Sequence, residues 1–283
     1  MFFCLDDGLL LFSKTLFMKR KIGGKLQWVI GLFLIAGSLL ASGSLHAQIY
    51  NDSSKTYKLY VEPYLMFTSM SGTTGLGNLP NTFICVPASE VFSHLKIGGM
   101  LYAEVHNDKL AYTSDLFYAN LSEDASTKNG VVSGSASLKQ FLWELEGLYR
   151  LSSWFEVGVG ARINNITAGL NVSYSPPLGG TPSSGNASKS NTWVDPLVVV
   201  RLKKVVQNKW LFQLRADMGG FGVGSSFAYQ LQPDIFYRAS KLMQFGVGYR
   251  LISMNYNNNK SGSDYFLYDM QEYGPQIRIG FNF

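Results

Sequence analysis

Charged side chains of both signs recur at alternate positions along several extended segments of this chain. Asp195 and Arg201 are an even number of residues apart in one segment, and so are Arg215 and Asp217 in the next. In a strand, residues of one parity lie on one face. Acids and bases that face each other across neighbouring strands can pair, which any buried charge requires. We predict an inward-facing charge network, either structural or a candidate constriction for solutes, formed by Asp195, Arg201, Arg215, Asp217, Arg250, Glu144 and Arg162.

Motifs for metal, phosphate or nucleophilic chemistry are weak in this chain. Its two cysteines and three histidines form no cluster with metal-site spacing, so we expect no metal and no cofactor. The glycine-rich run 219–225 has the composition of a phosphate-binding loop. Such a loop joins a strand to a helix, whereas here another extended segment follows. We therefore predict a tight hairpin or a bulge at this run, and no catalytic residue.

The elements that would position the charges are long strands of alternating polarity. At the end of the chain Ile277, Ile279, Phe281 and Phe283 share one face. The number of strands is not fixed by the pattern: eight or twelve are the alternatives to the ten given next, because 69–95 and 174–191 could hide or lose a strand. The pattern as a whole predicts about ten strands, at 57–67, 96–106, 110–121, 138–151, 154–174, 192–203, 209–218, 225–238, 242–256 and 264–283.

The predicted connections alternate between short and long. Those after the second, fourth, sixth and eighth strands have about two to five residues. The long ones are 69–95, which contains a short helix at 88–95, then 122–137 and 175–191. Short turns on one side and longer loops on the other are typical of membrane β-barrels, with the turns in the periplasm.

The face opposite the charges is apolar in strand after strand. Leu101, Ala103 and Val105 form one such row, and Phe245 and Val247 belong to another. An Arg or Lys that faced lipid at mid-bilayer would cost about 2–4 kcal/mol, which explains why one face lacks charges. A soluble sandwich or lipocalin-like barrel with its apolar face inward is the alternative. The long strands, the asymmetric loops and the aromatic end favour an all-β, closed antiparallel transmembrane β-barrel.

The interior of such a barrel would hold about ten acids and about nine bases. A ten-stranded barrel is only modestly wider than an eight-stranded one, whose side chains fill it. We therefore predict a largely filled, mixed-charge lumen, which disfavours a wide porin and leaves a narrow or gated channel open.

The first 47 residues resemble a leader with a cleavable signal peptide. A basic region at 18–25 precedes an apolar core at 28–40, and small residues lead to Ala47. We predict that translation starts at Met18 and that residues 48–283 form the barrel. Residues 48–283 carry 19 basic and 17 acidic side chains, so no nucleic-acid partner is expected.

Several stretches are similar to an uncharacterised family of outer-membrane β-barrel proteins from Gram-negative bacteria. They are 193–196, the Gly-Gly-Phe-Gly run within 215–225, 248–256 and the closing 274–283. Ala216 departs mildly from the glycine expected before Asp217. The resemblance implies Sec-type export, outer-membrane lipids as surroundings, and Phe283 as a signal to the assembly machinery. It brings no reaction and no catalytic residue.

These observations predict a small or gated channel, or a structural role. A surface-binding or adhesive barrel that acts through its outer loops is the first alternative. An outer-membrane hydrolase is the second, because barrel enzymes place His near Asp or Ser at the outer rim. Only His94 and His106 follow the leader, and His94 has Ser93 and Glu90 nearby in sequence. The transported solute or bound ligand stays unknown.

Overall fold

The computed structural model describes residues 57–126, 132–174 and 183–283. The chain divides into two units, 1–56 and 57–283, and the account below concerns the second. The predicted leader lies outside the described residues, as do 127–131 and 175–182 within two of the predicted loops.

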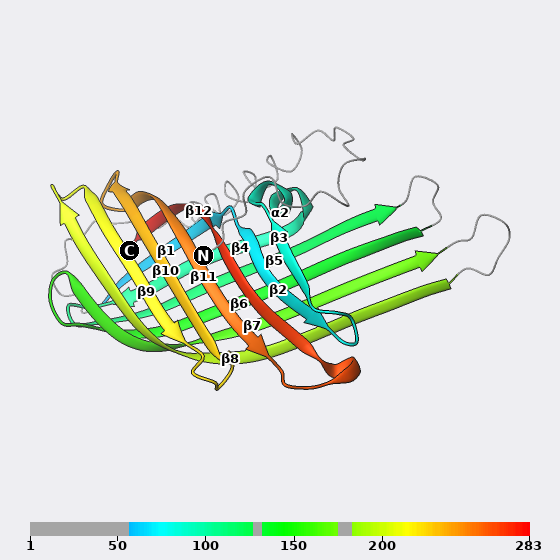
Figure 1. The fold of residues 1–283 in the computed structure, drawn as a ribbon. Helices are drawn as coiled ribbons and strands as arrows, with labels where there is room; N and C mark the ends of the chain where they lie inside the picture. The colour runs from blue at the N-terminus through cyan, green and yellow to red at the C-terminus, as the bar shows by residue number, and fades with distance from the viewer. Residues whose placement is uncertain (1–56, 127–131, 175–182) are drawn as a thin grey trace. The chain divides into compact units, whose positions relative to one another are not determined.

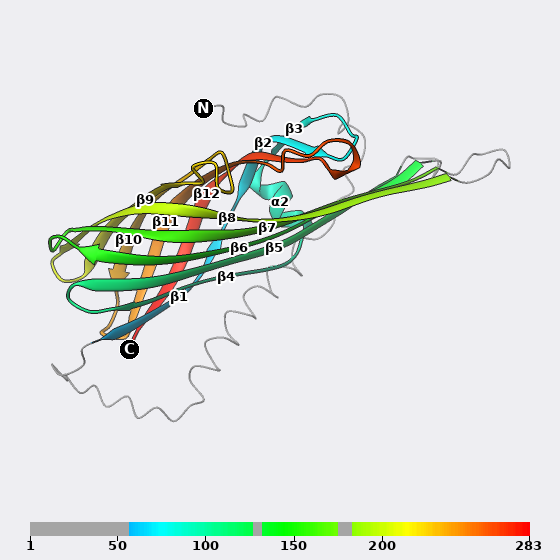
Figure 2. The same ribbon diagram turned by 90° about the horizontal axis from the view of Figure 1, so that it is seen from below.

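The described chain forms one antiparallel barrel, as the alternation of polarity predicted. Ten strands, β1 and β4 to β12, close through pairing of β1 with β12, and β2 and β3 form a hairpin outside the closed ring (Figures 1 and 2). The strands are β1 (Lys58–Met66), β2 (Ser69–Leu76), β3 (Thr82–Val86), β4 (Leu95–His106), β5 (Leu110–Ser126), β6 (Val132–Arg150), β7 (Phe155–Tyr174), β8 (Ser183–Val206), β9 (Trp210–Gly219), β10 (Phe227–Arg238), β11 (Met243–Asn257) and β12 (Phe266–Asn282), with helix α2 (Ala88–His94) and the short 3-10 helix η1 (Gly262–Asp264).

The last residue of the chain takes part in the closure. Tyr60 lies opposite Asn282, and the pairing continues to Met66 opposite Gln276. The Phe283 amide donates to the Leu59 carbonyl at 2.8 Å, and the Leu59 amide donates back at 3.3 Å. The alternating strand seen in the sequence therefore continues to the barrel seam.

A proline ends the pairing on the other side of β1. The ladder between β1 and β4 runs from Lys58 opposite His106 to Pro63 opposite Leu101. Proline has no amide hydrogen, so it cannot extend a ladder. Beyond Met66 the chain continues as β2, which pairs with the outer half of β12 and with β3. The predicted loop 69–95 is thus partly wrong, because it contains this hairpin as well as the expected helix.

Four strands project well beyond the others at the end with the long loops. β8 pairs with β7 over Ser183–Leu202, but with β9 only over Leu197–Val206. The predicted loops 122–137 and 175–191 are therefore wrong in part, since residues 122–126, 132–137 and 183–191 are strand. Figure 1 shows these four strands, β5 to β8, extending past the rest. We call the portions of β5 to β8 that extend past the other strands the outer sheet.

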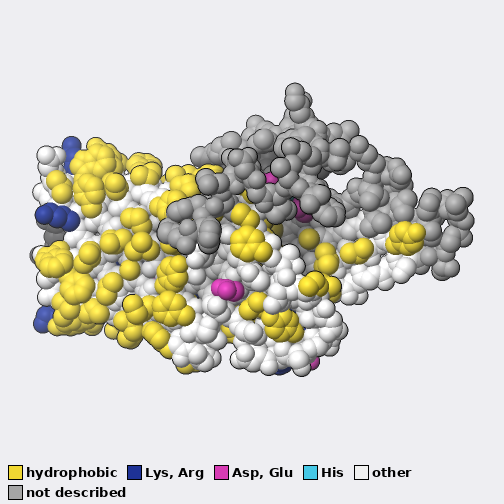
Figure 3. Space-filling model, viewed as in Figure 1, with side chains coloured by type: hydrophobic (Ala, Val, Ile, Leu, Met, Phe, Trp, Pro, Cys, Tyr) yellow, Lys and Arg dark blue, Asp and Glu magenta, His cyan; other side chains and the backbone are white. Residues whose placement is uncertain are grey.

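Apolar side chains are exposed on the outer surface of the barrel, and Figure 3 shows them on one face, where they form an apolar belt. Its exposed side chains include Leu101 and Val105 of β4, Val198 and Val200 of β8, and Phe245 of β11. The apolar faces predicted from the sequence point outward, which a bilayer favours and water does not. No helix among the described residues is long and apolar enough to span a bilayer. The soluble alternative needs the apolar face inside, whereas these apolar side chains are exposed on the outer surface.

Gly274 shows how tightly the seam is packed. A Cβ added at Gly274 would lie 1.8 Å from the Phe67 carbonyl oxygen, whereas a Cβ at Gly99 would meet nothing within 4 Å. We expect Gly274→Ala to destabilise the barrel by about 1–3 kcal/mol, because overpacking forces the backbone apart. Urea unfolding in detergent micelles measures the change, with Gly99→Ala as the matched control. Equal stability of the two variants would contradict this packing.

Candidate functional site

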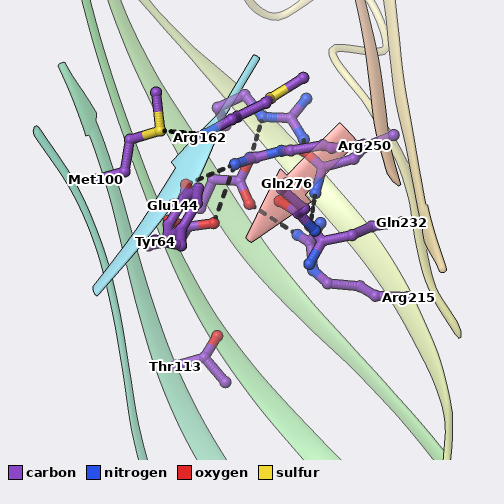
Figure 4. A network of polar contacts seen from close by, with 12 residues as sticks. Tyr64, Met100, Thr113, Glu144, Arg162, Arg215, Gln232, Arg250 and Gln276 are labelled. Atoms are coloured by element: carbon purple, nitrogen blue, oxygen red, sulfur yellow. Dashed lines mark hydrogen bonds and ion pairs between the residues drawn. The ribbon is translucent and has the colours of Figure 1, made fainter. Parts of the chain in front are cut away.

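Glu144 is the centre of a buried charge network in the lumen. Its carboxylate accepts hydrogen bonds from Arg162 at 2.8 Å, from Arg215 at 2.8 Å and from Arg250 at 3.0 Å. Asp217 lies 2.9 Å from both Arg162 and Arg215. These five side chains come from β6, β7, β9 and β11, and they meet because each has inward parity. Figure 4 shows four of them, Glu144, Arg162, Arg215 and Arg250. One carboxylate bound by three guanidinium groups holds four strands together.

A second set of contacts joins this centre to the seam strands. Arg250 also pairs with Asp115 at 3.2 Å and donates to the Tyr64 hydroxyl at 2.8 Å. Arg278 stacks over the Tyr64 ring at 4.7 Å and donates to Glu62. The seam between β1 and β12 is therefore tied to the opposite wall through the lumen.

Arg201 belongs to a separate cluster at the end with the short turns. It lies 2.5 Å from Glu104 and 2.5 Å from Glu156. Lys203 is 3.6 Å from each of these two acids. The structure thus places five of the seven predicted residues in one network, and Arg201 in another.

Asp195, the seventh predicted residue, is fully buried without a cation among its described partners. Its carboxylate accepts from the Ser225 amide at 2.6 Å, the Ser225 hydroxyl at 2.9 Å, Asn164 at 3.0 Å and the Trp193 indole at 3.1 Å. These donors fasten the glycine-rich connection between β9 and β10 to the barrel wall. Gly220 and Gly222 have φ of 82° and 77°, which favour glycine. The predicted hairpin role of this run agrees with its geometry.

The balance of lumen charge differs from the sequence expectation of about ten acids and nine bases. Four of those bases, Lys58, Arg150, Lys203 and Arg238, lie at strand ends where long side chains reach water. The buried charges of the described barrel are ten carboxyl groups and five guanidinium groups: Glu62, Glu104, Asp115, Glu144, Glu146, Glu156, Asp195, Asp217, Asp234 and Glu272, with Arg162, Arg201, Arg215, Arg250 and Arg278. The interior therefore has an excess of acids.

The outer half of the lumen is filled by apolar side chains. Its buried cluster includes Phe117, Leu142, Met254 and Phe266, and Val91 of α2 packs against it. The predicted helix therefore lies at the barrel mouth. Sequence reasoning missed this apolar half because its residues share parity with the buried charges, so that alternation alone marks them as interior without showing how they pack.

β9 and β10 do not reach as far out as β8. Two contacts join β8 to β11 and to the loop between β11 and β12 across the gap that they leave. The rings of Trp193 on β8 and Tyr256 on β11 stack at 4.0 Å with an interplanar angle of 5°. Farther out, Lys189 of β8 pairs with Asp264, and its hydrogen bond, followed by its charge, holds the pKa of Asp264 below its usual range. The outer sheet is thereby joined to the loop between β11 and β12.

Three acids come close enough to suggest a cation site, but a guanidinium group already lies among them. The carboxylate oxygens of Glu144, Glu146 and Asp217 lie within 4.8 Å of one another. Arg215 pairs with all three. The positive charge that this cluster requires is supplied by the chain itself.

The two histidines that the structure describes, His94 and His106, lie at opposite ends of the barrel. His94 lies 3.6 Å from Glu123, and its Nδ1 is 3.2 Å from the Ser93 hydroxyl. That hydroxyl donates to the Glu90 carbonyl at 2.9 Å. His106 lies at the opposite end, 3.1 Å from Glu104.

Arg162 offers a sharp test of the central network, because its side chain has no exposed area. Arg162→Met should destabilise the barrel by about 3–5 kcal/mol, since it leaves Glu144 and Asp217 under-compensated in a buried place. Guanidinium unfolding in detergent measures this change. Lys109→Met, at an exposed turn, is the control and should stay within about 0.5 kcal/mol of the wild type. Equal stabilities would mean that the network is not a structural element.

No family model and no curated protein matches this sequence. Among solved structures, the chain is similar to the outer membrane protease OmpT from Escherichia coli, at 8% identity and a TM-score of 0.43, with 81% of this chain and 97% of that chain covered. The attachment invasion locus protein Ail of Yersinia pestis shows 7% identity, a TM-score of 0.32 and coverage of 81% and 99%. The CymD monoaromatic hydrocarbon channel shows 10% identity and a TM-score of 0.34, with 80% of this chain and 88% of that chain covered.

Proposed function

We propose that this protein is an integral outer-membrane barrel of a Gram-negative bacterium, closed to solutes, that acts through its outer sheet. The observation that carries the proposal is a lumen filled along its length, by ion pairs in one part and by apolar packing in the other. A lumen of this kind gives the barrel rigidity, and leaves binding to its ends.

The belt and the short turns support the membrane assignment. A strand tilted across a bilayer needs about 9–11 residues, and the outward faces are apolar over such a length. β1 begins and β12 ends on the side of the barrel with the short turns, and our proposal assigns that side to the periplasm. Phe283 at the seam is then available as the assembly signal, and residues 1–47 as the export leader.

The outer sheet carries a polar face directly above the belt. On its outward side Asn165 donates to Thr192 at 2.6 Å, and Thr167 donates to Ser190 at 2.9 Å. Asn171 donates to Ser135 at 3.1 Å in a row farther out. Small hydroxyl and amide groups on a flat sheet can exchange hydrogen bonds with a polar, uncharged ligand, such as a glycan.

A narrow gated pore is the second candidate, and unpaired polar atoms inside the network favour it. Arg162 Nη1, Arg250 Nε and Gln276 Oε1 are buried without a hydrogen-bond partner in the described chain. Such atoms are sites for water. Together with the excess of acids, a water path here would select cations.

Conductance in a planar bilayer separates the two candidates. The refolded full chain should show no reproducible current steps, because no open path crosses the filled lumen. An Arg162→Ala/Arg250→Ala double variant should also show none, because the apolar outer half of the lumen stays filled. Regular steps from the wild type would overturn the closed barrel, and Asp217→Asn should then shift its ion selectivity.

Ligand binding by the outer sheet can be measured with the full chain in nanodiscs applied to a glycan array. A Thr167→Ala/Ser190→Ala/Asn171→Ala variant should lose at least about tenfold in binding, because each lost hydrogen bond contributes about 0.5–1.5 kcal/mol. Ser152→Ala/Ser153→Ala, at a periplasmic turn, is the control. Absence of glycan binding by the wild type, or equal binding by both variants, would contradict this role for the face.

A further inference from the structure

A small recess lies at the barrel mouth, at the end with the short turns. Its lining includes Val205, Lys209, Leu211, Phe236, Arg238 and Gln244. These residues lie on or next to β8, β9, β10 and β11, so four neighbouring strands contribute to it. The recess has about 170 Å³ of empty space, whereas sites for drug-sized ligands measure about 300–1,000 Å³. It therefore suits a small molecule or the end of a larger one.

The strand register arranges the lining in two rows. At the rim Arg238 lies opposite Gln244 on one side, and its amide donates to the Lys209 carbonyl at 2.7 Å on the other. Two positions farther into the barrel, Leu211 lies opposite Phe236. Side chains opposite each other in an antiparallel pair share a face and lie close together. The recess therefore has a polar row at its opening and an apolar row below it.

The two cations of the polar row have no counter-charge. Neither Lys209 nor Arg238 forms an ion pair or a side-chain hydrogen bond among the described residues, and both side chains are exposed. Asp234, the acid that shares their face on β10, lies 3.8 Å from Arg278. Like charges on opposite positions of two strands destabilise a sheet. An anion bound between Lys209 and Arg238 would remove this repulsion.

Gln244 adds a hydrogen-bond acceptor to the polar row. Its side chain is buried, and its amide nitrogen donates to the Tyr60 hydroxyl at 2.8 Å. Its amide oxygen accepts no hydrogen bond within the described chain. A nearly buried acceptor without a donor costs free energy. A ligand with an N–H group close to its anionic group would satisfy this oxygen.

We propose that this recess binds a small carboxylic acid with an apolar side chain and an N–H group beside the carboxylate, as in an N-acyl amino acid. Lys209 and Arg238 bind the carboxylate. Leu211 and Phe236 contact the apolar side chain, and the Gln244 amide oxygen accepts from the N–H group. A fatty acid lacks the donor, and inorganic phosphate lacks the apolar part. The recess lies at the end of the barrel opposite the outer sheet, so the proposal is independent of the ligand proposed for that sheet.

Calorimetric titration of the folded full chain in detergent with N-acetyl-leucine tests the proposal. N-acetyl-leucine amide, which lacks the carboxylate, should bind at least about tenfold more weakly, because hydrogen bonds to a charged group are lost. 4-Methylpentanoic acid keeps the carboxylate and the apolar chain but lacks the N–H group, and should bind about threefold more weakly. Equal affinity for all three compounds would overturn the assignment.

Variants of the polar row locate the binding. Lys209→Gln/Arg238→Gln should weaken the binding of N-acetyl-leucine at least about tenfold. Lys204→Gln/Lys241→Gln removes as much charge beside the same turns but outside the recess, and should stay within about twofold of the wild type because water and salt screen these charges. Gln244→Leu should lower the affinity for N-acetyl-leucine and leave that for 4-methylpentanoic acid unchanged.

Absence of binding by the folded wild type would overturn the proposal, and so would equal losses in the two double variants, which indicate diffuse attraction by charge. The mobility of unheated protein on a gel shows that each variant is folded, so a loss of fold is not mistaken for a loss of the site. The peptide Ala-Ala-Leu distinguishes two sources of the same chemistry. Binding as tight as that of N-acetyl-leucine identifies the carboxyl end of a peptide, and weaker binding identifies a free small acid.

Discussion

A bilayer offers no hydrogen-bond partners to a backbone, and this constraint accounts for most of the architecture. Every strand inside the belt needs a neighbour on each side. Pairing of β1 with β12 therefore closes the ring, and Phe283 lies where the last partner is required. Pro63 ends the ladder with β4 without leaving an amide hydrogen unpaired. Farther out, the Met100 sulfur lies 3.2 Å from the Met66 amide and accepts its hydrogen.

Closing the ring creates an interior that the sequence fills with charge. Burying an ion is costly unless a partner lies close. Glu144 meets this requirement with three arginines, and Asp195 meets it with four neutral donors. A lumen built in this way cannot be widened locally, because removal of one partner leaves another uncompensated. The same contacts that stabilise the barrel therefore oppose an open pore.

The strand parity of Glu144, Arg162, Arg215, Asp217 and Arg250 was enough to predict their common face. Parity gives no height along the barrel axis, so it could not separate Arg201 from this network. It also could not show that Lys58 and Arg238 lie beyond the lumen.

The limits of the strands were harder to predict than their faces. The alternation that marks a strand is imposed by lipid on one side and by the lumen on the other. Residues 183–191 lie above the belt, where neither applies, and their Ser, Asn and Gly content is typical of a loop. Pairing with β7 makes them strand. The hairpin of β2 and β3 was left open, as a strand that 69–95 could hide, for the same reason.

A filled lumen moves the chemistry of this protein to its two ends, and these ends differ in kind. The outer sheet offers neutral hydroxyl and amide groups that already bond to one another. The opposite end, with the short turns, carries exposed cations, among them Lys204, Lys209 and Lys241. A ligand would therefore meet neutral hydrogen-bonding groups at the first end, which act at short range, and positive charge at the second, which acts over a Debye length.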